Sequence, residues 1–142
     1  MPNIDFNTIN YLAVIVAGLA TFVLGGIWYS GLFGKLWIKY QGYTPEQVAE
    51  MKAKMSPVTF FGGMIVCYLV IAFVLAILFQ HFDVRSAMYG AKVGLALWAI
   101  VAAVGMTSRI AECKPFAGFL IDAIYQLIFL IMMGAIIGGW PK

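Results

Sequence analysis

Four long apolar runs dominate the pattern of hydrophobic and polar positions. Each is uncharged or carries a single charged side chain, and together they cover about residues 9–30, 58–79, 87–107 and 116–139. Because an α-helix rises about 1.5 Å per residue, about 20 residues cross a hydrocarbon core of about 30 Å. The pattern therefore predicts an all-α protein, a bundle of four transmembrane helices that forms one membrane domain over residues 1–142.

A shorter and more polar segment separates the first two runs. Its apolar side chains form one stripe and its lysines lie on the other side, in the order Phe33, Lys35, Leu36, Trp37, Lys39, Tyr40. Gly42 ends this stretch, and Thr44 with Gln47 has the spacing of a helix-capping pair. We predict one or two short amphipathic helices here. They lie in the membrane interface or pack on the bundle, and the pattern allows both arrangements.

Composition agrees with membrane insertion. Hydrophobic residues make up 63% of the chain and charged residues 11%, compared with about 25% charged in soluble domains. The net charge of +3 is concentrated in loops, so it indicates orientation in a lipid bilayer and not binding of nucleic acid. His81 and the two cysteines show no metal-binding spacing, and we expect neither a metal nor a cofactor.

Basic residues predict the orientation in the bilayer. Six lie in the loops after the first and third runs, namely Lys35, Lys39, Lys52, Lys54, Arg109 and Lys114. Arg85 and Lys142 lie on the other side, with Lys92 near its edge. Since basic loops stay in the cytoplasm, we expect a multi-pass protein of the cell membrane with both termini outside.

The last run contains the main candidates for chemistry. Asp122, Tyr125 and Gln126 stand at i, i+3 and i+4, so they lie on one side of a helix. A carboxylate inside the membrane is costly and must face protein or a cavity. Tyr29 and Ser30 at the end of the first run should lie at the same depth. Either these five residues bind a proton or a small ligand, or Asp122 only pairs structurally, with partners among Tyr29, Ser30, Thr107, Ser108, Arg109 and Lys35.

Glycines mark the expected helix contacts. Small residues let two helices approach closely in lipid. They occur at helical spacing in three of the runs, as Gly18 with Gly25, Gly90 with Gly94, and Gly134 with Gly138. The spacing leaves open whether these glycines pack within one chain or between copies.

Three stretches carry a resemblance to a known family. The chain opens with Asn10-Tyr11-Leu12-Ala13-Val14, continues with Trp28-Tyr29-Ser30 up to Trp37, and ends with a segment from Met133 to Gly138. It resembles the small bacterial and fungal membrane proteins grouped as domain of unknown function 1761. The resemblance covers nearly the whole chain, with one residue fewer between Ser30 and Phe33 and Gly31 where members often carry proline. It implies four membrane helices and no particular activity.

These observations favour three functions. The first is a homo-oligomeric protein that binds or moves a small solute or proton through Asp122, Tyr125 and Gln126. The second is a non-catalytic accessory protein whose polar stripe locks helices together and whose basic side contacts anionic lipid. The third and least favoured is a lipid-acting membrane enzyme, because no catalytic motif is visible and we expect no enzyme activity.

Overall fold

The computed structural model describes residues 3–141. In that part of the chain all regular secondary structure is helical. After a short turn at Phe6–Thr8 come α1 (Tyr11–Gly26), a π-helical segment η2 (Ile27–Leu32), α2 (Gly34–Gln41), α3 (Pro45–Lys54), α4 (Pro57–His81), α5 (Ala87–Ala111) and α6 (Phe116–Gly139). Four of these segments are long and apolar enough to cross a membrane, namely Tyr11–Leu32, α4, α5 and α6. The predicted all-α architecture is confirmed, with both short helices present between the first and second long segments.

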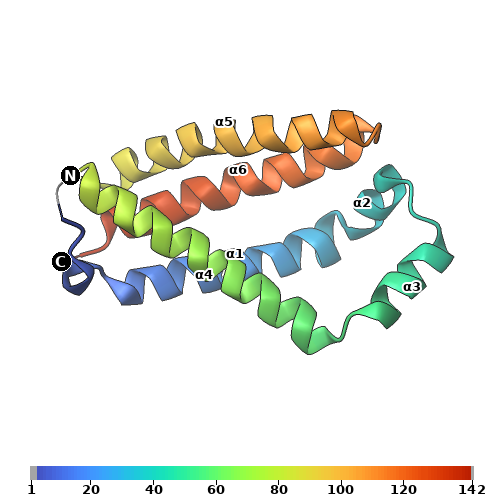
Figure 1. Ribbon diagram of the computed structural model, residues 1–142, viewed down its shortest axis with the longest axis horizontal. Helices are drawn as coiled ribbons and strands as arrows, with labels where there is room; N and C mark the ends of the chain where they lie inside the picture. Colours follow the sequence, from blue (N-terminus) through green and yellow to red (C-terminus); the bar gives the residue numbers. More distant parts are fainter. Residues whose placement is uncertain (1–2, 142) are drawn as a thin grey trace.

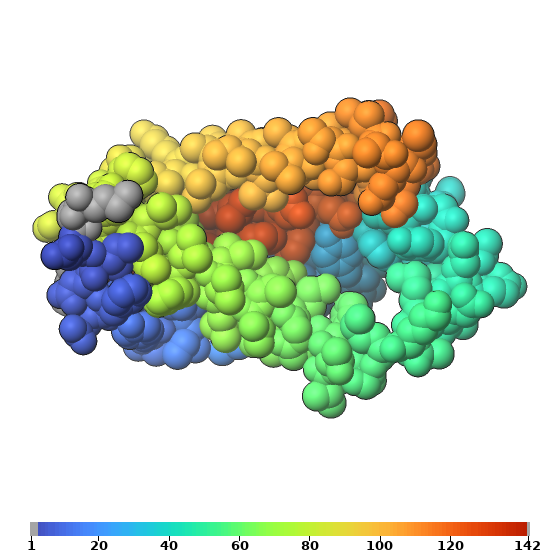
Figure 2. Space-filling view, in the orientation of Figure 1, coloured from blue at the N-terminus to red at the C-terminus, as the bar shows by residue number. Residues whose placement is uncertain are grey.

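Helix α6 occupies the centre of the bundle. It packs against α5 along its length and also contacts α1, α2 and α4, while α1 and α4 pack on each other (Figure 1). In the space-filling view α6 is visible between α4 and α5 (Figure 2). The helix that carries the polar stripe is therefore the one with most neighbours.

Glycines in α5 and α6 face each other. A Cβ added at Gly90 would overlap the carbonyl oxygen of Gly134, and one added at Gly94 would overlap that of Leu130. A Cβ at Gly138 would lie 2.6 Å from the carbonyl oxygen of Ser86. These two glycine pairs therefore pack the α5–α6 hairpin within one chain.

The connection from α1 to α2 turns the chain back onto the bundle. The last part of the first long segment is π-helical, and the amide of Phe33 donates to the carbonyl of Trp28 at 2.8 Å. Gly34 comes so close to the carbonyl of Tyr29 that a Cβ would overlap it. Of the two arrangements predicted for this segment, the structure shows packing on the bundle, because α2 lies against α6.

Helix α3 begins and ends as its sequence predicts. Thr44 and Gln47 form a reciprocal capping box, and Gly42 ends α2 in the left-handed conformation at φ 77°. Ser56 then caps α4 through the amide of Thr59. All side chains of α3 are partly or fully exposed, and the helix stands beside the bundle in Figure 1.

The two basic loops lie at one end of the molecule and the chain termini at the other (Figure 1). The predicted six basic residues thus share one end, whereas Arg85 lies in the turn at the opposite end. Lys142 lies outside the described residues. The assignment of the basic end to the cytoplasm stays a prediction.

Candidate functional site

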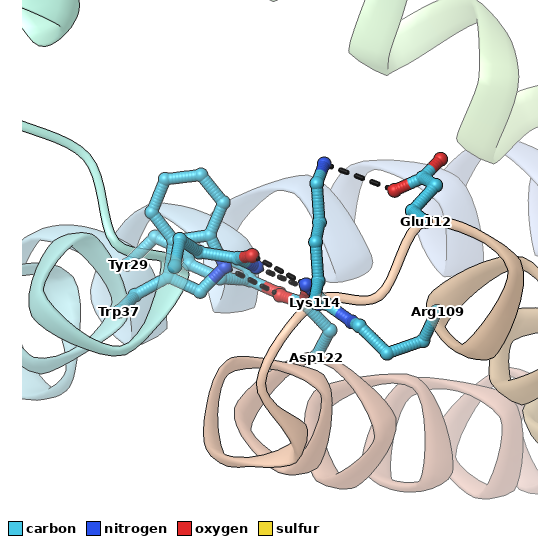
Figure 3. Close-up of polar contacts among 7 residues, drawn as sticks. Tyr29, Trp37, Arg109, Glu112, Lys114 and Asp122 are labelled. Atoms are coloured by element: carbon cyan, nitrogen blue, oxygen red, sulfur yellow. Dashed lines mark hydrogen bonds and ion pairs between the residues drawn. The ribbon is translucent and has the colours of Figure 1, made fainter.

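Asp122 lies at the centre of a polar cluster at the basic end (Figure 3). Its Oδ1 accepts hydrogen bonds from the Tyr29 hydroxyl at 2.5 Å and from the Trp37 indole Nε1 at 2.9 Å. Its Oδ2 accepts one from the Gln41 amide at 3.3 Å. The carboxylate sits six residues after the start of α6, about 9 Å along the helix axis, and is stabilised by three donors from other segments.

Gln41 bridges this carboxylate to a buried arginine. The Arg109 Nη1 donates to Gln41 Oε1 at 2.6 Å, while Arg109 Nη2 lies 3.8 Å from Asp122 Oδ2. The Arg109 side chain is only 9% exposed, and that of Asp122 is 28% exposed. An amide has both a donor and an acceptor, so one glutamine side chain can bond to both charged groups at once.

Helix geometry explains why these residues meet. Trp37 and Gln41 are four residues apart, so both lie on the side of α2 that faces α6, and Lys35 and Lys39 lie on the opposite side. Arg109 belongs to the last turn of α5, beside the tight loop that leads into α6. The site is thus built by three separate segments around the beginning of α6.

A cavity of about 230 Å³ lies next to the cluster. Its wall comes from the last turns of α5, the first half of α6, the loop between them and the end of α2. The lining residues are Gln41, Tyr43, Gly105, Ser108, Arg109, Glu112, Lys114, Phe119, Asp122 and Gln126. Lys114 Nζ and Glu112 Oε2 form an ion pair of 3.0 Å, with side chains 41% and 54% exposed (Figure 3). The cavity therefore offers charges of both signs in a region flanked by apolar helices.

The predicted polar stripe divides into two parts. Asp122 and Gln126 line the cavity, but Tyr125 is only 3% exposed and lies in the core. The Tyr125 hydroxyl donates to the Thr21 carbonyl at 2.8 Å and lies 3.0 Å from the Tyr68 hydroxyl. Tyr125 therefore joins α6 to α1 and α4 instead of lining the cavity.

Glycine on α1 makes room for that tyrosine. A Cβ at Gly25 would lie 2.7 Å from the Tyr125 hydroxyl, and one at Gly18 would lie 2.7 Å from a methyl carbon of Leu69. Both predicted packing glycines of the first segment thus stand at close helix contacts.

Three hydroxyl residues expected as possible partners of Asp122 do not bond to it, namely Ser30, Thr107 and Ser108. Ser30 is exposed and its hydroxyl donates to the Gly26 carbonyl of the preceding turn, while Thr107 and Ser108 donate to the Val104 carbonyl. A serine in a helix commonly bonds back in this way because the carbonyl four residues earlier is within reach. Sequence reasoning missed Gln41 and assigned Trp37 to an apolar stripe, although their spacing of four residues places both on one helix face.

Within residues 3–141, no group of three His, Cys, Asp or Glu side chains is placed to hold a metal ion. The charged residues at the cavity form two ion pairs, Arg109 with Asp122 and Lys114 with Glu112.

A family model described as "Protein of unknown function (DUF1761)" matches residues 12–138. The chain belongs to this family. The matched region includes the Trp28 to Trp37 stretch, two of whose aromatic residues bind Asp122. No curated protein and no solved structure matches the chain. Family membership thus agrees with four membrane-span-like helices and assigns no activity.

Proposed function

We propose that this DUF1761 protein binds a small polar solute in the cavity beside Asp122. The observation that carries the proposal is the Gln126 side chain at the cavity wall. Gln126 lies ten residues after the start of α6, about 15 Å along the helix, a depth at which polar groups are costly in lipid. Its amide makes no hydrogen bond within residues 3–141, so it is available to a bound molecule.

Two further features support binding. The cavity volume of about 230 Å³ is about eight times the volume of one molecule in liquid water, which suits a small metabolite. Asp122 at its wall is held in place by hydrogen bonds from Tyr29, Trp37 and Gln41. Preorganised groups reduce the free-energy cost of ordering a site around a ligand.

Binding is tested with the purified protein in detergent, by following thermal unfolding in a panel of sugars, amino acids, carboxylates, phosphates and amines. At least one class should raise the Tm of the wild type in a concentration-dependent way, because ligands that bind only the folded state stabilise it. Gln126→Leu removes the amide from the cavity wall at nearly constant side-chain size and should remove that response. Ile124→Leu is the matched control, because Ile124 is exposed on the outer face of α6 and does not line the cavity. A panel without any response, or a normal response in Gln126→Leu, would refute the proposal.

Transport is the extension of this proposal. A solute that enters from the basic end meets closely packed helices beyond Gln126, and Tyr125, Thr21 and Tyr68 are joined by hydrogen bonds beside it. Movement across the membrane therefore requires this packing to open. Flux of the identified solute into proteoliposomes tests the extension, and binding without flux would limit the protein to a binding role.

Homo-oligomer formation belongs to the same proposal. Only 11% of the most apolar window of α5 and 17% of that of α4 is buried inside the chain, so large apolar surfaces remain for lipid or further copies. Native mass spectrometry should show more than one copy per particle, and a monomer at all protein concentrations would contradict it.

A second candidate is a non-catalytic accessory role, favoured by the number of partners of Asp122. The carboxylate accepts three hydrogen bonds and lies near Arg109. A residue whose role is to hold neighbouring helices together needs such contacts. In that case Asp122→Asn impairs assembly or stability, and no solute in the panel has an effect.

A further inference from the structure

The guanidinium of Arg109 uses few of its hydrogen-bond donors. It carries five N–H groups, yet within residues 3–141 it makes a single hydrogen bond, the one to Gln41. Asp122 lies 3.8 Å from Nη2, which is beyond hydrogen-bond distance. More than nine-tenths of this side chain is nevertheless buried. In residues 3–141 the only buried side-chain nitrogen or oxygen without a hydrogen-bond partner is the Trp28 indole Nε1, so the unused Arg109 nitrogens remain accessible, and the residue lines the cavity.

The neighbouring carboxylate forms an ion pair with Arg109 but accepts no hydrogen bond from it. Asp122 Oδ2 lies 3.8 Å from Nη2, and the hydrogen bonds that its two oxygens accept come from Tyr29, Trp37 and Gln41. The unused N–H groups belong to a residue that lines the cavity. A ligand in the cavity is therefore the available acceptor for them.

The second cation at the cavity has a looser partner. Lys114 pairs with Glu112, and both side chains are about half exposed, so the pair can open at small cost. An ammonium group has three donors, and a single carboxylate oxygen contacts it here. Arg109 and Lys114 thus present cationic donors to the same cavity from the end of α5 and the loop that follows it.

We propose that the solute of this cavity carries an oxyanionic group, either a carboxylate or a phosphate. Arg109 binds this group with its unused N–H groups, and Lys114 binds it with its ammonium group. The inference rests on the proposed binding function and names the ligand class. A planar guanidinium with parallel donors matches the geometry of these oxyanions. A lipid headgroup and a free solute both carry such groups, and the experiment separates these two sources.

The test measures binding of inorganic phosphate and of acetate to the full chain in detergent, through thermal shifts at constant ionic strength, with chloride as the reference anion. Methylammonium and an uncharged sugar serve as non-anionic probes. In parallel, the protein in nanodiscs of phosphatidylcholine is compared with nanodiscs that also contain phosphatidic acid, and native mass spectrometry detects retained lipid.

Three variants locate the site. Arg109→Lys keeps the charge but loses the forked donors, and we expect about tenfold weaker binding of the oxyanion, the equivalent of about 1.4 kcal/mol. Lys114→Gln changes a side chain that is 41% exposed, and it should weaken binding by a similar factor even if Arg109→Lys does not fold. Lys54→Gln removes one positive charge at the same end outside the cavity and should bind normally.

The outcomes separate the two proposals. A response to phosphate or acetate that Lys114→Gln weakens supports a free oxyanion, and a response to phosphatidic acid alone with the same variant effect supports a lipid headgroup. Stabilisation by methylammonium or by the sugar only would overturn the oxyanion and leave the binding function intact. No response to any small probe or lipid would overturn both.

Discussion

The anchoring of α2 by Asp122 leads to a quantitative prediction for Asp122→Asn. The amide oxygen of asparagine can still accept from Tyr29 and Trp37, but as a neutral acceptor. Hydrogen bonds to charged groups contribute about 1.5–3 kcal/mol and neutral ones about 0.5–1.5 kcal/mol, so about 1 kcal/mol is lost for each of these two bonds.

The other oxygen is replaced by an amino group that faces two donors, Gln41 Nε2 and the Arg109 guanidinium. If Gln41 rotates to accept from the new amino group, it gives up its bond from Arg109. This adds about 1 kcal/mol, and partial exposure of the carboxylate reduces the sum. We expect the continuous segment of η2 and α2, which carries Tyr29, Trp37 and Gln41, to lose about 2–3 kcal/mol of docking free energy.

Hydrogen–deuterium exchange of the α2 amides measures this loss. An eight-residue helix is not stable on its own in water, so exchange of residues 34–41 reports opening from the bundle. A loss of about 2–3 kcal/mol corresponds to about 30- to 150-fold faster exchange.

The matched control is Asp83→Asn. Asp83 pairs with Arg85 in an exposed turn at the opposite end of the molecule, so its substitution should leave α2 exchange unchanged. Folded Asp122→Asn protein whose α2 amides exchange within about twofold of the wild type would refute the anchoring role.

Three further predictions follow from the packing and the charges. Gly90→Ala should lower the Tm by several degrees because the new Cβ meets the backbone of α6. Gly63→Ala should not lower it, because no atom lies within 4 Å of the added Cβ, and equal effects of the two substitutions would contradict the proposed contact. Tyr125→Phe should cost about 1 kcal/mol through loss of its hydrogen bond to Thr21, while Tyr11→Phe at an exposed tyrosine should cost less, and the difference is measured by thermal unfolding in detergent. Reporter fusions at both termini should be active outside the cytoplasm, and a cytoplasmic C-terminus would reverse the predicted orientation.

The fold was largely predictable because its determinants are local. Runs of more than 20 apolar residues specify membrane helices, and Thr44 with Gln47 specifies the start of α3. The glycine pairs predicted close contacts, but their partners became known only from the structure. The spacing of the glycines shows that one face of a helix has no large side chains. It does not show which neighbouring helix packs against that face.

The site was predictable only in part. Tyr29 and Asp122 were expected at the same depth, and they are hydrogen-bonded. The contribution of Trp37 and Gln41 depends on the π-helical segment and on the close approach at Gly34, which redirect α2 toward α6. No periodicity in the sequence encodes that change of direction.

The separation of Tyr125 from Gln126 has a simple geometric cause. Neighbouring residues of an α-helix point about 100° apart, so the two side chains lie on opposite flanks of Asp122. One flank faces α1 and α4, and the other faces the cavity. Residues at i, i+3 and i+4 therefore span a helix face wide enough to contact two different surroundings, and their spacing alone did not show that Tyr125 and Gln126 would be separated.

The central claim is that a polar cavity reaches Gln126 from the basic end, and its most direct test is cysteine labelling in membrane vesicles. Gln126→Cys and Ile124→Cys are compared in a chain whose Cys67 and Cys113 are replaced by alanine, using a charged thiol reagent that does not cross the membrane. Gln126→Cys should react when the reagent is on the side of the basic loops, and Ile124→Cys, on the outer face of α6, should not. Equal protection of the two cysteines from both sides would contradict the account.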